Sequence, residues 1–212
     1  MNRNLTPDSI NFDVLHPEPL LIVISGPSGI GKDAVVKELQ KRDLPLHFVI
    51  TATSRPPRKE ETHGVDYFFV TKEEFEEMIA QDELIEHAWV YNQYKGVPKE
   101  QVRQAMKSGK DVIMRLDVQG AHKIRSLCPE AVLIFLIPSN TLEWQDRLLA
   151  RNTETSEDFS LRIETAKQEL ESLPIFDYIV LNAHNCLDQA VDTIEKIIQV
   201  EHHRVNPRKI SL

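Results

Sequence analysis

The amino-acid sequence predicts an α/β fold built on a doubly wound parallel sheet. Short runs of continuously apolar residues, such as residues 20–25 and 132–137, alternate along the chain with helical patterns. Strands that are apolar on both faces are typical of a parallel sheet that is covered by helices on each side. The chain has 212 residues, of which 41% are hydrophobic, so we expect one domain with a substantial core and insertions.

Each element of this sheet is placed by its pattern. Residues 20–25 form the first expected strand, and a helix follows over residues 33–41. Further strands are expected over 112–116, 132–137 and 178–181, and further helices over 119–126 and from 187 to about 203. Residues 1–19 contain three prolines and no sustained periodicity, so we expect a flexible, extended arm.

Two segments interrupt the alternation. Residues 51–97 begin with a proline-rich, charged loop, and a helix starts after Thr71 with Glu74 in position for a capping box. With a possible strand over 67–70 and an apolar run over 84–91, this segment predicts a small inserted β-rich subdomain. Residues 139–172 read as two helical stretches around the polar loop RNTETSED, which suits a mobile lid. The core then consists of residues 20–50, 98–138 and 173–212.

The composition excludes several classes of function. A net charge of −8 argues against general affinity for nucleic acid or an anionic membrane, so an anion site needs a local cluster of basic residues. Cys128 and Cys186 lie far apart and have no paired spacing, which argues against a disulfide framework or a zinc site. No apolar run approaches the roughly 20 residues of a membrane span, and no signal-peptide core is present, so we expect a cytoplasmic protein.

A glycine-rich stretch, GPSGIGKD, directly follows the first expected strand. The spacing G-x-x-x-x-G-K between a strand and a helix predicts a phosphate-binding loop. In such a loop, backbone N–H groups at a helix N-terminus bind phosphate oxygens and the lysine supplies charge. The loop indicates a nucleoside triphosphate ligand but does not identify an acceptor. Its candidate ligands are Gly26, Pro27, Ser28, Gly29, Ile30, Gly31, Lys32 and Asp33.

Further motifs point to one family. They are TATSRPPRKEE at 51–61, GVDY at 64–67, Glu86, YKG at 94–96 and DVQG at 117–120. With GPSGIGK, they make the chain resemble the guanylate kinases from residue 20 to its end. The resemblance implies a phosphate-loop kinase core with a GMP-binding insert over 51–97 and a helical lid over 139–172. It also implies transfer of the γ-phosphoryl group of ATP, bound with Mg²⁺, to GMP or dGMP.

The expected acceptor-phosphate site contains two arginines. Arg55 and Arg58 lie three positions apart on a proline-stiffened loop, so both guanidinium groups can reach one phosphate, and the hydroxyl of Tyr67 can add a neutral donor. The resemblance implies that this phosphate belongs to GMP, and that Tyr94 and Lys95 contribute to the same site.

Carboxylates are natural readers of guanine, because its N1–H and exocyclic amine are both donors on one edge. Glu86 and Asp117 match the family's guanine readers, and Thr51 matches a residue whose hydroxyl bonds the guanine carbonyl oxygen. A base without those donors would leave buried acceptors unpaired, so such a site can discriminate strongly.

The lid carries further basic residues. Arg147 and Arg151 lie four positions apart on one expected helix face, and Arg162 follows on the next helix. The resemblance implies that these arginines close over the transferring phosphoryl group, and that Asn182 contacts the donor adenine. It assigns the catalytic contacts to Lys32, Arg55, Arg147, Arg151 and Arg162.

The sequence departs from the family pattern at charged positions. Asp33 replaces the usual Ser or Thr that reaches Mg²⁺, and Arg115 replaces an acid near the metal. We expect the carboxylate either to pair with Arg115 or to ligate Mg²⁺ directly, since hard oxygen donors suit that ion. Lys95 replaces a phosphate-contacting tyrosine, and Val97 replaces a hydroxyl that helps to read guanine, so base selectivity is expected to be somewhat relaxed.

Two other functions stay open from the sequence. One is a guanylate-kinase-like binding module without catalysis, and the other is a kinase for a different phosphorylated acceptor. The intact Lys32 and the lid arginines favour the guanylate kinase. We expect ATP and GMP as ligands, a monomer or homodimer, and no nucleic acid or membrane partner.

Overall fold

The computed structural model describes residues 15–90, 92–149 and 156–211 of the chain. Most of the expected N-terminal arm and part of the polar loop RNTETSED lie outside these residues. Within the described residues, no helix is both long enough and apolar enough to cross a membrane. Cys128 is buried, Cys186 is half-buried, and both are free thiols.

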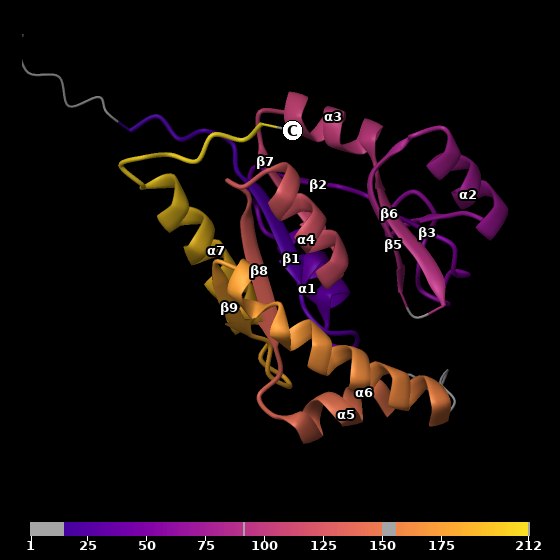
Figure 1. The fold of residues 1–212 in the computed structure, drawn as a ribbon. Helices are drawn as coiled ribbons and strands as arrows, with labels where there is room; N and C mark the ends of the chain where they lie inside the picture. The colour runs from indigo at the N-terminus through magenta and orange to yellow at the C-terminus, as the bar shows by residue number, and fades with distance from the viewer. Residues whose placement is uncertain (1–14, 91, 150–155, 212) are drawn as a thin grey trace, which may run out of the picture.

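The main sheet has five strands, and every pairing in it is parallel. This confirms the predicted parallel sheet, in which the first strand of the chain lies at the centre (Figure 1). The strand order is β2 (Leu46–Phe48), β7 (Asp111–Arg115), β1 (Leu21–Ser25), β8 (Val132–Ile137) and β9 (Tyr178–Leu181). All five residues of β1 are buried, as its continuous apolar run requires.

Helices cover both faces of this sheet, which confirms the doubly wound architecture (Figure 1). Helices α1 (Lys32–Leu39) and α7 (Leu187–His202) bury Leu39 and Ile194 against one face. Helices α3 (Lys99–Lys107) and α4 (Val118–Leu127) bury Val102 and Ile124 against the other. Val97 also lies in this second core cluster.

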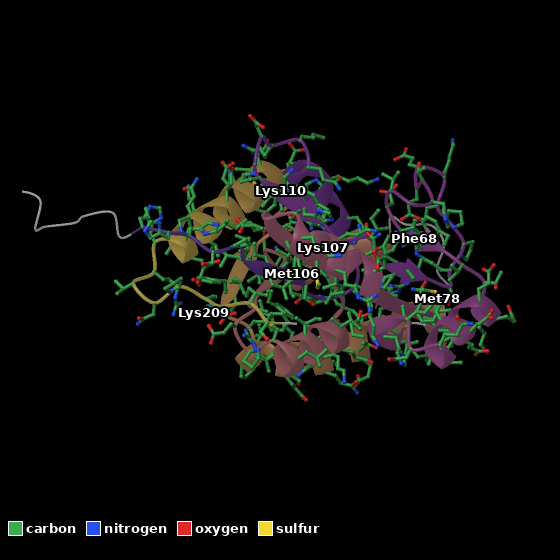
Figure 2. All side chains as sticks on the ribbon, turned by 90° about the horizontal axis from the view of Figure 1, so that it is seen from above. Phe68, Met78, Met106, Lys107, Lys110 and Lys209 are labelled. Carbon is green, nitrogen blue, oxygen red and sulfur yellow. The ribbon has the colours of Figure 1, made fainter. Side chains whose placement is uncertain are left out.

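A second, smaller sheet stands beside the main one (Figure 1). Its strands, in spatial order, are β4 (Phe68–Phe69), β3 (Ala52–Thr53), β6 (Gln93–Pro98) and β5 (Leu84–Val90), and it carries helix α2 (Lys72–Ala80). Thr71 and Glu74 form the predicted capping box at the start of α2. Seen from above, Phe68 and Met78 lie in this part of the molecule, well apart from Met106 and Lys107 of α3 (Figure 2).

Two helices lie below the main sheet in the view of Figure 1. They are α5 (Thr141–Leu149) and α6 (Ser156–Glu171), followed by a short 3₁₀ helix, η2 (Leu173–Ile175). Trp144 and Leu148 of α5 pack on Ala166 of α6 in a small apolar cluster of their own. This cluster is separate from the two main-sheet clusters.

The end of the chain is held to the core by a buried acid. Glu201 is only 1% exposed, accepts a hydrogen bond of 2.6 Å from the hydroxyl of Tyr178, and receives the guanidinium of Arg208 at 2.7 and 3.1 Å. Burial raises the pKa of Glu201, but the hydrogen bonds from Arg208 and Tyr178 outweigh it, and the net pKa lies below its ordinary value. The C-terminal segment is therefore tied to β9 and α7.

We predict that Arg208→Met lowers the free energy of unfolding by about 3 to 5 kcal/mol, because it leaves Glu201 charged and buried without its partner. Arg204→Met is the matched control: Arg204 contacts the same carboxylate at 3.5 Å, but its side chain is 47% exposed, so less than about 1 kcal/mol is expected. Urea denaturation of both variants measures the difference. Equal losses would contradict this account of the C-terminal segment.

Candidate functional site

The predicted phosphate loop connects β1 to α1. Gly26, Gly29 and Gly31 have φ values of +136°, +83° and +95°, a region that favours glycine. A Cβ on Gly26 would also lie 2.6 Å from the carbonyl oxygen of Leu136. The glycines are therefore needed for the path of the loop, which brings its backbone to the N-terminus of α1.

Lys32 is the first residue of α1, and its ammonium folds over the loop. Its Nζ donates to the carbonyl oxygens of Gly26 and Pro27. Burial lowers the pKa of Lys32 to about 8; the carboxylate of Glu169 on α6 opposes this shift and the ammonium of Lys95 adds to it. The negative charge of a bound phosphate would favour the ammonium form of Lys32 and raise this pKa.

Asp33 pairs with Arg115, as one of the two sequence hypotheses expected. Nη1 of Arg115 lies 2.9 Å from Oδ1 of Asp33, and the hydroxyl of Tyr67 donates to the same oxygen at 3.1 Å. Burial alone would raise the pKa of Asp33, but the positive charges of Arg115 and Lys32 outweigh this effect and bring the pKa down to about 2. The acid in the phosphate loop is therefore ionised and its charge is compensated.

Arg115 also joins the main sheet to the insert. Its Nη2 donates to the carbonyl oxygen of Asp66 at 2.5 Å, and its guanidinium lies 4.1 Å from the centre of the Tyr67 ring. Lys37 of α1 adds an ion pair of 2.8 Å with the Asp66 carboxylate. The phosphate loop and residues 66–67 are thus held together by one set of contacts.

The two arginines of the insert are organised by an acid that the sequence reasoning did not assign to the site. Glu61 accepts two hydrogen bonds from Arg55, at 2.6 and 2.7 Å, and one of 2.8 Å from the backbone N–H of Arg58. Arg55 also lies over the ring of Tyr67 at 5.0 Å. The spacing of Glu61, three residues after Arg58, was the available signal for this contact.

The phosphate loop, the insert and α6 meet around a cavity of about 60 Å³. This cavity brings together residues that are far apart in the sequence. Its basic side chains are Lys32, Arg55, Arg58, Lys95 and Arg162, and its acids are Asp33, Asp117 and Glu169. Glu169 is a further lining residue that the sequence reasoning missed, because one acid among several on a polar helix carries no distinguishing pattern.

A smaller cavity of about 20 Å³ continues from this one, since Lys32, Lys95 and Asp117 line both. Thr51 and Glu86 complete its polar wall. Thr51 Oγ1 is buried and has no hydrogen-bond partner among the described residues. The small cavity therefore presents a free hydroxyl next to carboxylates.

Glu86 has a strongly raised pKa. It is 5% exposed, and burial raises its pKa to about 8, with a further contribution from the neighbouring Asp117. Partial burial also lowers the pKa of Lys95, which lies at the junction of the two cavities. A ligand with hydrogen-bond donors on one edge would stabilise the charged form of Glu86.

Tyr94 and Val97 do not line either cavity. The ring of Tyr94 stacks on Phe75 at 5.1 Å, and its hydroxyl donates to Glu76 at 3.3 Å. Val97 is fully buried in the core beside the main sheet. The structure therefore places Tyr94 in the apolar cluster of the insert. Val97 lies opposite Glu86 in the pairing of β5 with β6, but it packs in the core and does not line the small cavity.

The predicted lid arginines occupy different positions. Arg162 lines the larger cavity and donates to Ser28 Oγ of the phosphate loop. Arg147 donates to the carbonyl oxygens of Ile30 and Asn182, at 3.1 and 2.8 Å, and so lies against the loop backbone. Asn182 donates to Ile30 as well, at 2.7 Å. Arg151 lies outside the described residues.

Basic side chains from the phosphate loop and from the insert face one cavity, as an enzyme that brings two phosphorylated molecules together requires. This fold and site define the class of phosphate-loop kinases that act on mononucleotides. A family model described as guanylate kinase matches residues 18–201. The chain belongs to the guanylate kinase family.

Individual relatives agree with this assignment. The chain is 46% identical to "Guanylate kinase 2, chloroplastic/mitochondrial" of Oryza sativa subsp. japonica, over 92% of this chain and 69% of that protein. It is 42% identical to the guanylate kinase of Bacillus subtilis (strain 168), over 89% and 94% of the two chains. A crystal structure of guanylate kinase from Anaplasma phagocytophilum matches with a TM-score of 0.71 and 27% identity, over 90% of each chain.

We predict that Arg115→Ala lowers kcat/KM for ATP at least about tenfold, because the charge of Asp33 then faces the phosphates without compensation. The double variant Asp33→Ser, Arg115→Asp removes that charge from the loop and is expected to keep most of the activity. Arg103→Ala, at a side chain that is 62% exposed, serves as the control. Equal damage from the single and the double variant would refute compensation.

Proposed function

We propose that this protein transfers the γ-phosphoryl group of ATP to GMP, giving ADP and GDP. The observation that supports it most is the pair of adjoining cavities: Arg55, Arg58 and Arg162 line only the first, Thr51 and Glu86 line only the second, and Lys32, Lys95 and Asp117 line both. One mononucleotide matches this arrangement, because its phosphate is negatively charged and its purine base carries hydrogen-bond donors. A monomer or homodimer that acts in the cytoplasm stays the prediction for its state and location.

The donor nucleotide is assigned to the phosphate loop. Backbone N–H groups between Gly26 and Asp33 would bind the phosphate oxygens at the start of α1, and Lys32 would exchange its loop carbonyls for the β and γ phosphates. Arg162 is near enough to the loop to contact the same phosphates. We assign the contact with adenine to Asn182, whose carbonyl oxygen accepts a hydrogen bond from Arg147.

The acceptor phosphate is assigned to the insert. Arg55 and Arg58 are held by Glu61 on one loop, and Tyr67 places its hydroxyl between them and the phosphate loop. Lys95 adds a cation at the point where the two cavities meet. A phosphate bound there would lie next to the end of the donor triphosphate, which is the geometry that an in-line transfer needs.

The base is assigned to Glu86, Asp117 and Thr51. An ionised carboxylate only accepts hydrogen bonds, so Glu86 and Asp117 match the N1–H and the exocyclic amine of guanine. The unpartnered hydroxyl of Thr51 can donate to the guanine carbonyl oxygen. Adenine has no N1–H and would leave a buried acceptor unpaired, at a cost of about 1 to 3 kcal/mol for each group.

The loop also fits Mg²⁺ bound with ATP. Asp33 is a hard oxygen donor whose Oδ1 is taken by Arg115 and Tyr67, whereas its Oδ2 has a long contact of 3.9 Å to Arg58. Mg²⁺ would neutralise charge on the β and γ phosphates when it is bound there. Asp33 would hold it through Oδ2, directly or through water.

Catalysis then rests on positioning and on compensation of charge. The attacking oxygen already belongs to a phosphate, so no protein nucleophile is required. Lys32, Arg55 and Arg162 surround the space between the two phosphate sites and would stabilise negative charge that spreads over the transferring group. Exclusion of water by the insert and by α6 strengthens these interactions.

A turnover screen of GMP, AMP, CMP and UMP with ATP and Mg²⁺ tests the proposal. We expect GMP to be preferred by at least about a hundredfold, because sites built to bond donors reject bases that lack them by such factors. Glu86→Gln is expected to reduce this preference, whereas Asp82→Asn, at an exposed acid, leaves it unchanged. Faster turnover of another acceptor, or no ADP despite tight GMP binding, would contradict the proposed function.

A further inference from the structure

We propose that Gly120 is a positioning residue for base selection: it orients Asp117 through its N–H and leaves room for the carboxylate of Glu86 through its missing side chain. The proposal rests on the proposed function, because it concerns the two acids that read the base. Gly120 is buried in the first turn of α4. Its N–H would be present in any residue except proline, whereas the space for Glu86 requires glycine.

The first contact is a helix cap. Asp117 is the N-cap of α4, and its Oδ1 accepts a hydrogen bond of 2.9 Å from the backbone N–H of Gly120. This bond fixes the rotation of the carboxylate and uses one of its oxygens. The other oxygen remains for a ligand in the two cavities that Asp117 lines.

The second contact depends on the absence of a Cβ. A Cβ on Gly120 would lie 2.9 Å from Glu86 Oε2 and 3.2 Å from its Cδ, closer than real Cβ atoms normally come. Its φ is not in the left-handed region, so the backbone itself would accept alanine. Glycine inside a helix costs about 0.5 to 1 kcal/mol relative to alanine. Space for Glu86 therefore explains why glycine stands here.

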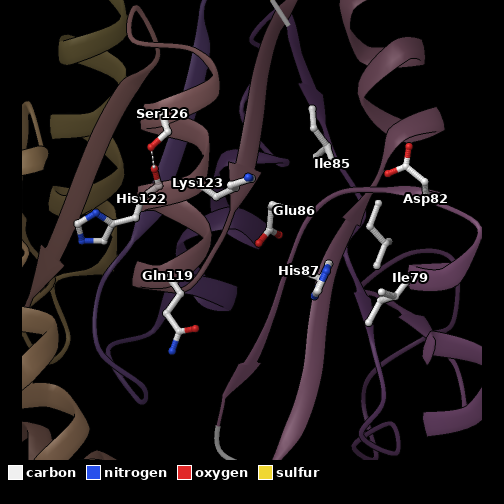
Figure 3. A pocket seen from close by; sticks show the side chains of 10 residues that line it. Ile79, Asp82, Ile85, Glu86, His87, Gln119, His122, Lys123 and Ser126 are labelled. Atoms are coloured by element: carbon white, nitrogen blue, oxygen red, sulfur yellow. Dashed lines mark hydrogen bonds between the residues drawn. The ribbon is translucent and has the colours of Figure 1, made fainter.

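The surroundings of Glu86 determine what a larger residue would do. On one side Glu86 borders the small cavity with Thr51, and on the other a cavity of about 590 Å³ between β5 and α4. Figure 3 shows its carboxylate between the two elements, directed towards the side of α4 that carries Gln119. The end of the side chain can move into the 590 Å³ cavity, so a Cβ at position 120 would displace mainly Glu86, with Leu116 Cβ at 3.3 Å as the next contact.

The variant Gly120→Ala tests this role by selectivity. Inosine monophosphate lacks the exocyclic amine of GMP, so the ratio of kcat/KM for the two acceptors reports the contact of the carboxylates with that amine. We expect Gly120→Ala to raise KM for GMP about tenfold or more, to change kcat less, and to lower the ratio towards that of Glu86→Ala. Its unfolding midpoint should not fall, because alanine favours the helix.

Two further variants separate positioning from general damage. Gln119→Ala changes the neighbouring, exposed residue of the same helix and should leave the ratio unchanged. In a Glu86→Ala background, Gly120→Ala should have little further effect, since its clash is gone. An unchanged ratio in Gly120→Ala, where Glu86→Ala does lower it, would overturn the role of Gly120 and leave the proposed function standing. An unchanged ratio in Glu86→Ala would overturn both.

Discussion

The site depends on holding many charges of both signs in one partly buried region. Each such charge loses hydration, and an uncompensated one costs several kcal/mol. The protein meets this constraint with pairs: Asp33 with Arg115, and Glu61 with Arg55. Burial and the neighbouring Asp117 raise the pKa of Glu86 to about 8, and the charge of Lys95 opposes this shift only in part. In the proposed function, substrate binding would replace these internal partners by phosphate oxygens and by the hydrogen-bond donors of a base.

The same pairs connect the parts of the molecule. Arg115 ends a central strand of the main sheet, yet it contacts Asp33 at the start of α1 and residues 66–67 of the insert. Asp33, which alone would repel phosphate, is therefore part of the junction between the phosphate loop and the insert. Asp33 and Arg115 face each other and carry opposite charges, so either one alone would leave a charge uncompensated.

Much of this could be predicted from the sequence. The continuous apolar runs of β1, β7 and β8 identify the parallel sheet, because both faces of these strands are buried, whereas Ile179 and Leu181 of the edge strand β9 are exposed. Strand β2 has three residues and β3 two, too short for any periodicity, and β6 contains Gly96 and Pro98, which weaken a strand pattern. The pair Asp33–Arg115 was one of two hypotheses from the sequence, because the start of the helix after the phosphate loop and the end of the neighbouring strand carry opposite charges. The contacts of Glu61 and the packing of Tyr94 depend on the path of loops and side chains, which local pattern does not specify.

Proton release on GMP binding tests the central claim most directly. If Glu86 is neutral in the free protein, with its pKa of about 8, and ionised when it accepts from guanine, binding at about pH 7 should release close to one proton. Calorimetry in buffers of different ionisation enthalpy measures this number, and Glu86→Gln subtracts the contribution of the phosphate. We expect the release in the native protein and its loss in Glu86→Gln. Equal release from both proteins would contradict the account.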